Sequence, residues 1–192
     1  MSAGCTMRVV MLIGLSLLAV IMPAASWSGE NPSGRASVIN GDTLSVRGKV
    51  IGLYGIAAPN LKQDCLDASS RSYSCGAASA QALAAQISTA IITCETRQPD
   101  QNGRILATCR KDGEDLSAWM VSQGHATADR QVSTAYVVDE RQAWAKRRGL
   151  WAGVFDDPAP RRHTPFSAMH QFVAAQSDER ANEPSTTASV KR

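Results

Sequence analysis

Four of the five cysteines lie beyond residue 26, and their type and spacing define the clearest chemistry in the chain. Cys65, Cys75, Cys94 and Cys109 follow one another at spacings of 10, 19 and 15 residues. Thiols form disulfides or bind zinc, but structural zinc sites usually contain cysteine pairs separated by about two to four residues. No such pair is present, so the spacing favours disulfides, for which four cysteines allow three connectivities.

The other side chains with catalytic or polyanion-binding potential are scattered along the chain. His125, His163 and His170 form no cluster in the sequence, and His125 is expected to pack or to cap a helix end. Residues 146–148 and 161–162 are short basic runs. Runs of this length are more typical of a solvated helix face than of a dedicated polyanion site.

Residues 1–26 have the pattern of a secretory signal peptide. Arg8 is their single charged residue, Val9–Met22 is almost wholly apolar, and small residues follow at 24–26. Met7 is an equally good start to Met1. The alternative is an uncleaved anchor, but the apolar run is shorter than the roughly 20 residues of a spanning helix. We therefore expect an exported protein, periplasmic or secreted, with no membrane span after signal removal.

Length and charge set further bounds on the mature chain. The 192 residues suffice for one domain of about 100–150 residues plus its ends. Loss of Arg8 with the signal leaves 19 basic against 17 acidic residues. This weak positive bias neither demands nor excludes a nucleic-acid partner. An even number of cysteines in an exported chain supports the disulfide interpretation.

The first half of the mature chain predicts three strands and a helix. After a polar lead-in at residues 27–35, the runs "RASVIN", "DTLSVRG" and "KVIGLYGI" are strand-like and are separated by the turn signals "NGD" and "RGK". A polar loop is expected at 57–76. A helix is expected next, because apolar residues follow helical spacing. These residues are Ala80, Leu83, Ala84, Ile87 and Ile91.

A hairpin predicted after this helix bears on the disulfide pairing. The strand-like runs "AIITCET" and "RILATCRK" flank the turn "RQPDQNG", which is centred near residues 101–102. Cys94 and Cys109 are about equally distant from that centre, and facing positions on a hairpin come within disulfide range. We therefore favour the connectivity Cys65–Cys75 and Cys94–Cys109.

Two more helices complete the predicted domain. One is expected within 112–124, where Gly124 ends it. The other is expected from a heptad repeat of Tyr136, Ala143 and Leu150, with Val137, Trp144 and Trp151 beside them. The domain is expected to span residues 36–156. Residues 157–192 are rich in proline, charge and small polar residues and predict a mostly disordered tail, with a short apolar patch near 166–173.

The element order β-β-β-α-β-β-α-α indicates an α+β fold, in which a five-stranded OB-type β-barrel carries three helices. Six segments resemble the staphylococcal nuclease (thermonuclease) family, in particular its secreted bacterial branch. They are "NGDTLSV", "IGLYGIAAPN", "YSCGAASAQAL", "NGRILATC", "DLSAWMVSQGHA" and "ERQAWAKRRGLWAGVF". They occur in order over residues 37–155. The resemblance implies the barrel fold and calcium-dependent hydrolysis of phosphodiester bonds.

In this family carboxylates hold the calcium ion, arginines neutralise charge on the phosphate, and a carboxylate organises the attacking water. By the resemblance, Asp42 corresponds to a metal-binding aspartate and Arg104 to one phosphate-binding arginine. Both family side chains are therefore retained.

Four other positions of the family pattern carry different side chains. Asn40 replaces the first aspartate of a D-G-D-T motif, and Gly52 replaces an arginine. Ala57 stands where the family has a second metal-binding aspartate, and Asn60 stands where it has the catalytic glutamate. Asn60 can hydrogen-bond water but cannot accept its proton.

These replacements predict little nuclease activity. Calcium prefers six to eight oxygen ligands with several carboxylates, so one aspartate would hold it weakly. Loss of one electrostatic contact commonly costs about a hundredfold in rate. Asp64, Asp67 and Asp100 are the carboxylates nearest in sequence, but catalytic geometry is strict. We therefore expect no catalytic or metal-binding residue, no cofactor, and a chain that leans away from enzymatic function.

The overall pattern of signal, four cysteines, barrel and tail resembles thermonuclease-like proteins of bacterial exopolysaccharide (succinoglycan) biosynthesis. The expected function is an accessory or binding role there, with an anionic polysaccharide or the exopolysaccharide machinery as partner. The alternative is an active secreted nuclease that cleaves DNA or RNA with calcium. It would use Asp42, Arg104 and substitutes that the sequence does not reveal.

Overall fold

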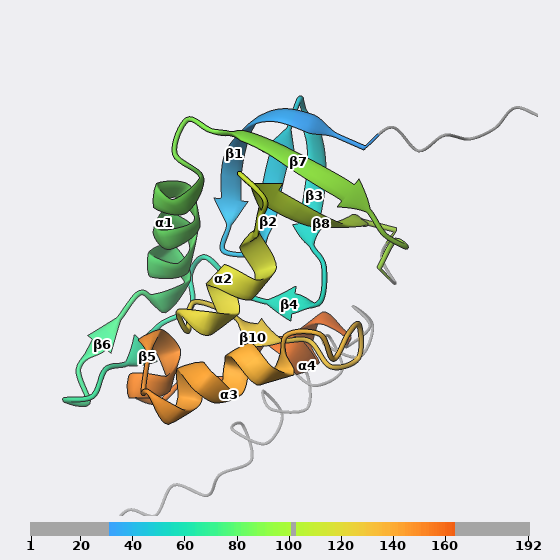
Figure 1. Ribbon diagram of the computed structural model, residues 1–192. Helices are drawn as coiled ribbons and strands as arrows, with labels where there is room; N and C mark the ends of the chain where they lie inside the picture. Colours follow the sequence, from blue (N-terminus) through green and yellow to red (C-terminus); the bar gives the residue numbers. More distant parts are fainter. Residues whose placement is uncertain (1–30, 101–102, 164–192) are drawn as a thin grey trace, which may run out of the picture.

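The computed structural model describes residues 31–100 and 103–163 (Figure 1). The predicted signal peptide, the centre of the predicted hairpin turn, His170 and the apolar patch near 166–173 lie outside the described residues. Within the described ranges, every helix is too short or too polar to cross a membrane.

Five strands form a closed barrel (Figure 1). They are β1 (Ser33–Asn40), β2 (Thr43–Val46), β3 (Lys49–Leu53), β7 (Ile91–Thr96) and β8 (Ile105–Lys111). Neighbours pair antiparallel in the order β3-β2-β1-β7-β8, and a parallel pairing of β3 with β8 closes the ring. The predicted α+β fold with a five-stranded OB-type barrel is therefore confirmed.

The first strand starts earlier than the sequence predicts. β1 begins at Ser33, inside the segment predicted as a polar lead-in, because residues 33–35 pair with residues 91–93 of β7. This pairing partner is far away in sequence, so local composition could not reveal it. The domain start predicted at residue 36 is therefore three residues late.

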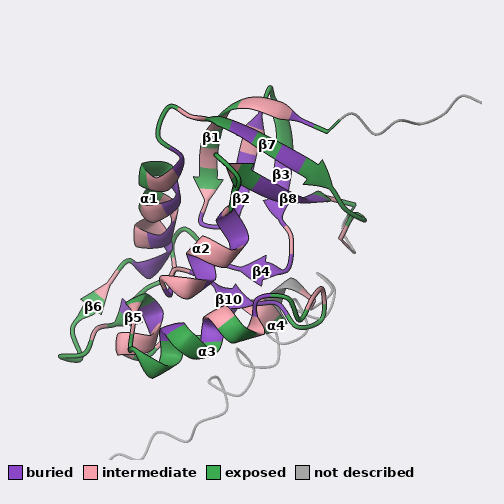
Figure 2. Cartoon of the chain, in the orientation of Figure 1, coloured by how far each residue is buried: buried purple, intermediate pink, exposed green. Residues whose placement is uncertain are grey.

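The core lies inside the barrel and under the helices (Figure 2). Leu44 and Val46 on β2, Ile51 and Leu53 on β3, and Ile92 on β7 are almost fully buried. Leu44, Val46 and Ile92 show the alternation typical of a strand with one face in the core. Fully burying an aliphatic side chain of this size stabilises the fold by about 1.5–3 kcal/mol.

Short strands join the barrel to the helices. β4 (Ile56–Ala57) pairs antiparallel with β10 (Thr127–Ala128), and β9 (Glu114–Asp115) pairs antiparallel with the end of β8. β5 (Cys65–Leu66) pairs with β6 (Ser72–Tyr73), so the segment predicted as a polar loop contains a small hairpin.

The helices begin and end differently from the predictions in two places. The first helix, α1 (Cys75–Ile87), ends before Ile91, which lies on β7 with 55% exposure. The helical spacing of apolar residues therefore continued past the real end of the helix, which lies at Ser88, where φ is +47°. α2 (Leu116–Ser122) follows Asp115, whose carboxylate accepts hydrogen bonds from the N–H groups of Ser117 and Ala118.

The third predicted helix is two elements, α3 (Val137–Ala145) and a 3-10 helix, η1 (Gly149–Ala152). The break has a backbone cause. Gly124 and Gly149 touch through their main chains, and a Cβ at Gly124 would lie 2.1 Å from the Arg148 carbonyl oxygen. Tyr136 and Leu150 are buried as the repeat predicts, whereas Trp144 is 65% exposed.

The segment predicted as a disordered tail begins with ordered structure. α4 (Pro158–Arg162) follows Asp157, whose carboxylate accepts a hydrogen bond from the Ala159 N–H. The tail prediction over 157–192 is therefore wrong for residues 157–163. The composition of this stretch did not indicate that Asp157 and His163 contact Thr127 and Asp129.

Both favoured disulfides are formed. Cys65 is bonded to Cys75, and Cys94 is bonded to Cys109. Cys94 and Cys109 are direct cross-strand neighbours of the β7–β8 hairpin, with Cα atoms 4.0 Å apart. The first bridge fixes β5 to the start of α1, because Cys75 is the first residue of that helix.

Candidate functional site

The retained aspartate lies at the start of β2 and is part of the main-chain framework. Asp42 is 1% exposed. Its Oδ1 atom accepts a hydrogen bond from the Thr43 hydroxyl at 2.9 Å, and its Oδ2 atom accepts one from the Ala58 N–H at 2.6 Å. Asn40 holds the turn before β2, because its Oδ1 atom accepts from the Asp42 N–H at 3.0 Å.

The retained arginine lies just before β8 and has several partners. Arg104 Nε donates to Asp100 Oδ2 at 3.0 Å, and Arg104 Nη1 donates to the Thr43 hydroxyl at 3.0 Å. The same Nη1 atom is 4.0 Å from Asp42 Oδ1. Arg104 therefore pairs with both Asp42 and Asp100, and Asp100 is the closer carboxylate.

The guanidinium of Arg104 takes up the space beside Gly52. Gly52 faces Leu106 across the parallel β3–β8 pairing. A Cβ at Gly52 would lie 2.9 Å from Arg104 Cζ and 2.8 Å from a Leu106 methyl carbon. These distances are shorter than Cβ contacts in proteins, so a side chain at position 52 requires both neighbours to move.

The two remaining positions of the family pattern differ in exposure. Ala57 on β4 is fully buried and faces Thr127 on β10. Asn60 is exposed, and its Oδ1 atom accepts a hydrogen bond from the Lys62 N–H at 3.2 Å. Its own N–H donates to Gln63 Oε1 at 3.3 Å. The Asn60 amide therefore shapes the loop after β4.

Two of the three carboxylates considered as substitutes lie on the β5–β6 hairpin. Asp64 accepts a hydrogen bond from the Ser74 hydroxyl at 2.9 Å. Asp67 accepts from the N–H groups of Ser69 and Arg71, and the Arg71 N–H is the main reason that its pKa is lowered. Figure 1 shows this hairpin on the opposite side of the molecule from the start of β8. Of these three carboxylates, only Asp100 lies beside Arg104.

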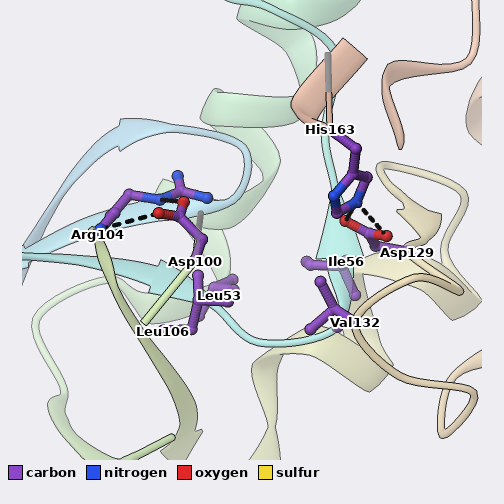
Figure 3. Close-up of a pocket in the computed structure, with 9 residues that line it drawn as sticks. Leu53, Ile56, Asp100, Arg104, Leu106, Asp129, Val132 and His163 are labelled. Carbon is purple, nitrogen blue, oxygen red and sulfur yellow. Dashed lines mark hydrogen bonds and ion pairs between the residues drawn. The ribbon is translucent and has the colours of Figure 1, made fainter. Parts of the chain in front are cut away.

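A small pocket adjoins Arg104 (Figure 3). The Arg104–Asp100 pair lies at one end and a second pair, Asp129 with His163, lies at the other, with apolar side chains between them. The lining residues are Leu53, Gly55, Ile56, Asp100, Arg104, Leu106, Asp129, Val132 and His163. The pocket therefore brings Asp100 and Arg104, from the β7–β8 connection, close to His163 of the C-terminal segment.

Sequence reasoning missed the Asp129–His163 pair. His163 Nε2 lies 2.8 Å from each carboxylate oxygen of Asp129, and Asp129 is only 2% exposed. Asp129 directly follows β10, which α3 holds in place through a hydrogen bond from the Ala128 N–H to Glu140. The two partners are 34 residues apart, so no local pattern could have joined them.

His125 and the basic run at 146–148, which the sequence also singled out, lie outside this pocket. The His125 ring lies 5.6 Å from the Trp119 ring, and burial lowers the His125 pKa. In the basic run, Lys146 and Arg147 are exposed, whereas Arg148 donates to the Ser122 carbonyl oxygen at 3.0 Å. Within residues 31–100 and 103–163, no three His, Cys, Asp or Glu side chains gather as metal ligands would.

Two comparisons relate this chain to known proteins. Residues 50–153 match the family described as Staphylococcal nuclease homologue. The chain is also 37% identical over 142 residues to the succinoglycan biosynthesis protein ExoI of Rhizobium meliloti (strain 1021), which covers 72% of this chain and 74% of that protein. The matched region includes the β3–β8 contact, β4, β10 and α3. The chain therefore belongs to the staphylococcal nuclease homologue family.

Proposed function

We propose that this chain is an exported pseudoenzyme, a thermonuclease-like barrel that acts as a binding or accessory factor in exopolysaccharide biosynthesis of the succinoglycan type. The similarity to ExoI supports the process, because that protein is named for succinoglycan biosynthesis. Two disulfides support export, since such bonds persist in oxidising compartments.

The observation that carries the non-catalytic part of the proposal is the position of Arg104. In phosphoryl transfer an arginine must present its N–H groups to the phosphate. Here Nε is bound by Asp100, Nη1 is bound by Thr43, and the guanidinium packs over Gly52. Nε and Nη1 are thereby committed to protein partners, and the rest of the guanidinium, in a side chain that is 26% exposed, borders the pocket.

The donor set around Asp42 also supports the proposal. A calcium ion needs several oxygen ligands, and both carboxylate oxygens of Asp42 already accept hydrogen bonds from the protein. Ala57 has no oxygen in its side chain, and Asn60 Oδ1 accepts from the main chain of its own loop. These residues do not fit a calcium site.

A nuclease assay tests the non-catalytic part. The purified, oxidised mature chain should leave single-stranded DNA and RNA intact in millimolar calcium, with the same background as in chelator. Calcium-dependent cleavage that disappears in Arg104→Ala would refute the proposal. It would establish the alternative, an active nuclease that uses Asp42 and Arg104.

A binding assay tests the accessory part. Succinoglycan oligosaccharides titrated into the mature chain should bind, and Arg104→Gln should weaken binding because it removes the cation beside the pocket. Arg47→Gln is the matched control, because Arg47 is an exposed arginine at the other end of β2. Equal effects of the two variants, or no binding at all, would contradict a saccharide site at this end of the barrel.

A further inference from the structure

The C-terminal strap, defined as residues Asp157–His163, folds back over the pair β4–β10 and ends in the pocket beside Arg104 (Figures 1 and 3). We propose that this strap is an autoinhibitory contact that closes the pocket, and that its release opens the pocket to a ligand. The identity of that ligand as an acidic saccharide rests on the proposed function. The closure itself does not.

The first anchor of the strap lies on the strand pair that carries Ala57. The Thr127 hydroxyl is 3.0 Å from Asp157 Oδ1 and 3.3 Å from the Ala57 carbonyl oxygen. Thr127 is 1% exposed and directly faces Ala57 in the register. The same Asp157 carboxylate caps α4 through the Ala159 N–H. One carboxylate therefore both caps the start of α4 and attaches it to β10.

The second anchor is the imidazole of His163. Its Nε2 atom is shared between the two oxygens of Asp129 at 2.8 Å, and the His163 side chain is 14% exposed. His163 and Asp129 both line the pocket that contains Arg104. The strap therefore supplies one wall of this pocket, at the end opposite the Arg104–Asp100 pair (Figure 3).

Between the anchors the strap is a single short helix. α4 packs against β4 and β10, and Pro158 is buried there. Segments with few buried apolar contacts open locally at low free-energy cost, well below global unfolding. Among the described contacts, the strap is attached through Asp157, His163 and the packing of α4 on β4 and β10, whereas the barrel is closed by continuous strand pairing, so we expect the strap to open before the barrel does.

Opening of the strap would remove His163 from one end of the pocket and leave the Arg104–Asp100 pair at the other end unchanged. Arg104 and Asp100 lie in the β7–β8 connection, outside the strap, so the proposal leaves them in place. Asp129, which is buried under the strap, would lose the imidazole and gain access to water. A ligand could then lie over the apolar floor formed by Leu53 and Leu106 and bring an acidic group to Arg104.

A ligand-independent experiment tests the closure. Val132→Cys places a thiol on the pocket lining, and its rate of reaction with a maleimide reports access. In the full mature chain, adding Asp157→Ala and His163→Ala should raise the labelling rate by about tenfold or more, because both anchors are lost. Asp64→Ala, an exposed acid on the β5–β6 hairpin, is the control and should leave the rate unchanged.

A second, more conservative variant distinguishes release of the strap from general unfolding. Thr127→Val keeps the side-chain volume and removes only the hydroxyl of the first anchor, so it should raise the labelling rate in the same direction. If neither the double variant nor Thr127→Val changes the rate while circular dichroism stays native, the strap does not close the pocket and the proposal is wrong.

Titration with succinoglycan oligosaccharides separates this proposal from the proposed function. Tighter binding to the double variant than to the parent chain, by about tenfold, supports autoinhibition. Weaker binding would overturn it, because His163 would then be a contact for the ligand. Faster labelling with no binding in either protein would support the strap as a closure and refute the saccharide function.

Discussion

Ala57→Asp tests whether this buried alanine stands at the position of a metal-binding carboxylate. The new side chain would be introduced at a fully buried residue, directly before Ala58, whose N–H is 2.6 Å from Asp42 Oδ2. It would thus bring a second carboxylate close to one that is 1% exposed. Arg104 Nη1 lies 4.0 Å from Asp42 Oδ1, but the Arg104 guanidinium is already bound to Asp100.

The expected cost follows from burial of an unpaired charge. Leaving one buried charge without its partner destabilises proteins by about 3–5 kcal/mol, which is a large part of a typical total of about 5–15 kcal/mol. Ala57→Asn is the matched control, because it has the same shape without the charge. Its cost should be about 1–3 kcal/mol, the desolvation of a buried amide.

Calcium distinguishes a metal position from an ordinary buried site. Urea denaturation of the mature chain, Ala57→Asp and Ala57→Asn would be measured with calcium and with chelator. Calcium should return stability to Ala57→Asp only, by up to about 2.7 kcal/mol at a hundredfold excess over the dissociation constant. If Ala57→Asp is as stable as Ala57→Asn in chelator, or if calcium has no effect on it, the assignment of position 57 is wrong.

Three further outcomes are expected from the structure. Replacing both Cys94 and Cys109 by serine should lower the free energy of unfolding by about 3 kcal/mol, because the bridge joins residues 15 apart in sequence. The measurement is urea denaturation against the oxidised parent. Gly52→Arg should cost about 1–3 kcal/mol in the same assay, since Arg104 must move, and an unchanged midpoint would contradict the packing described. Burial raises the pKa of Tyr136 to about 12, so the native state holds its proton more tightly than the unfolded state. Stability should therefore be intact below about pH 10 and fall as pH rises toward 12, by up to about 1.4 kcal/mol per pH unit, and Tyr136→Phe should lack this component of the slope.

The barrel and the disulfides could be predicted because their signals are local. The strands alternate between core and solvent, glycine turns separate β2 from β3, and the β7–β8 hairpin places Cys94 opposite Cys109. The end of α1 was missed because Ile91 continued a helical spacing although it belongs to the next strand. A pattern of apolar residues does not mark the point where the backbone changes conformation.

The candidate site could be predicted only in part. The resemblance pointed to Asp42 and Arg104, which the structure does bring within 4.0 Å of each other. It could not show that Asp100 is the closer partner of Arg104. The sequence named His163 as a candidate but could not pair it with Asp129, because their contact depends on how far the chain turns after η1 and on where α4 docks.

The contact between Gly124 and Gly149 has a consequence for how this protein tolerates change. The Leu150 N–H donates to the Gly124 carbonyl oxygen at 2.9 Å, and a Cβ at Gly149 would lie 2.4 Å from that oxygen. The position of η1 after α3 is thus fixed by main-chain atoms of these two glycines and Leu150. Exposed side chains on α3 can be substituted during evolution without moving η1, provided that both glycines are retained. Relatives that keep this glycine pair should place their C-terminal segments alike, even where α3 has diverged beyond recognition.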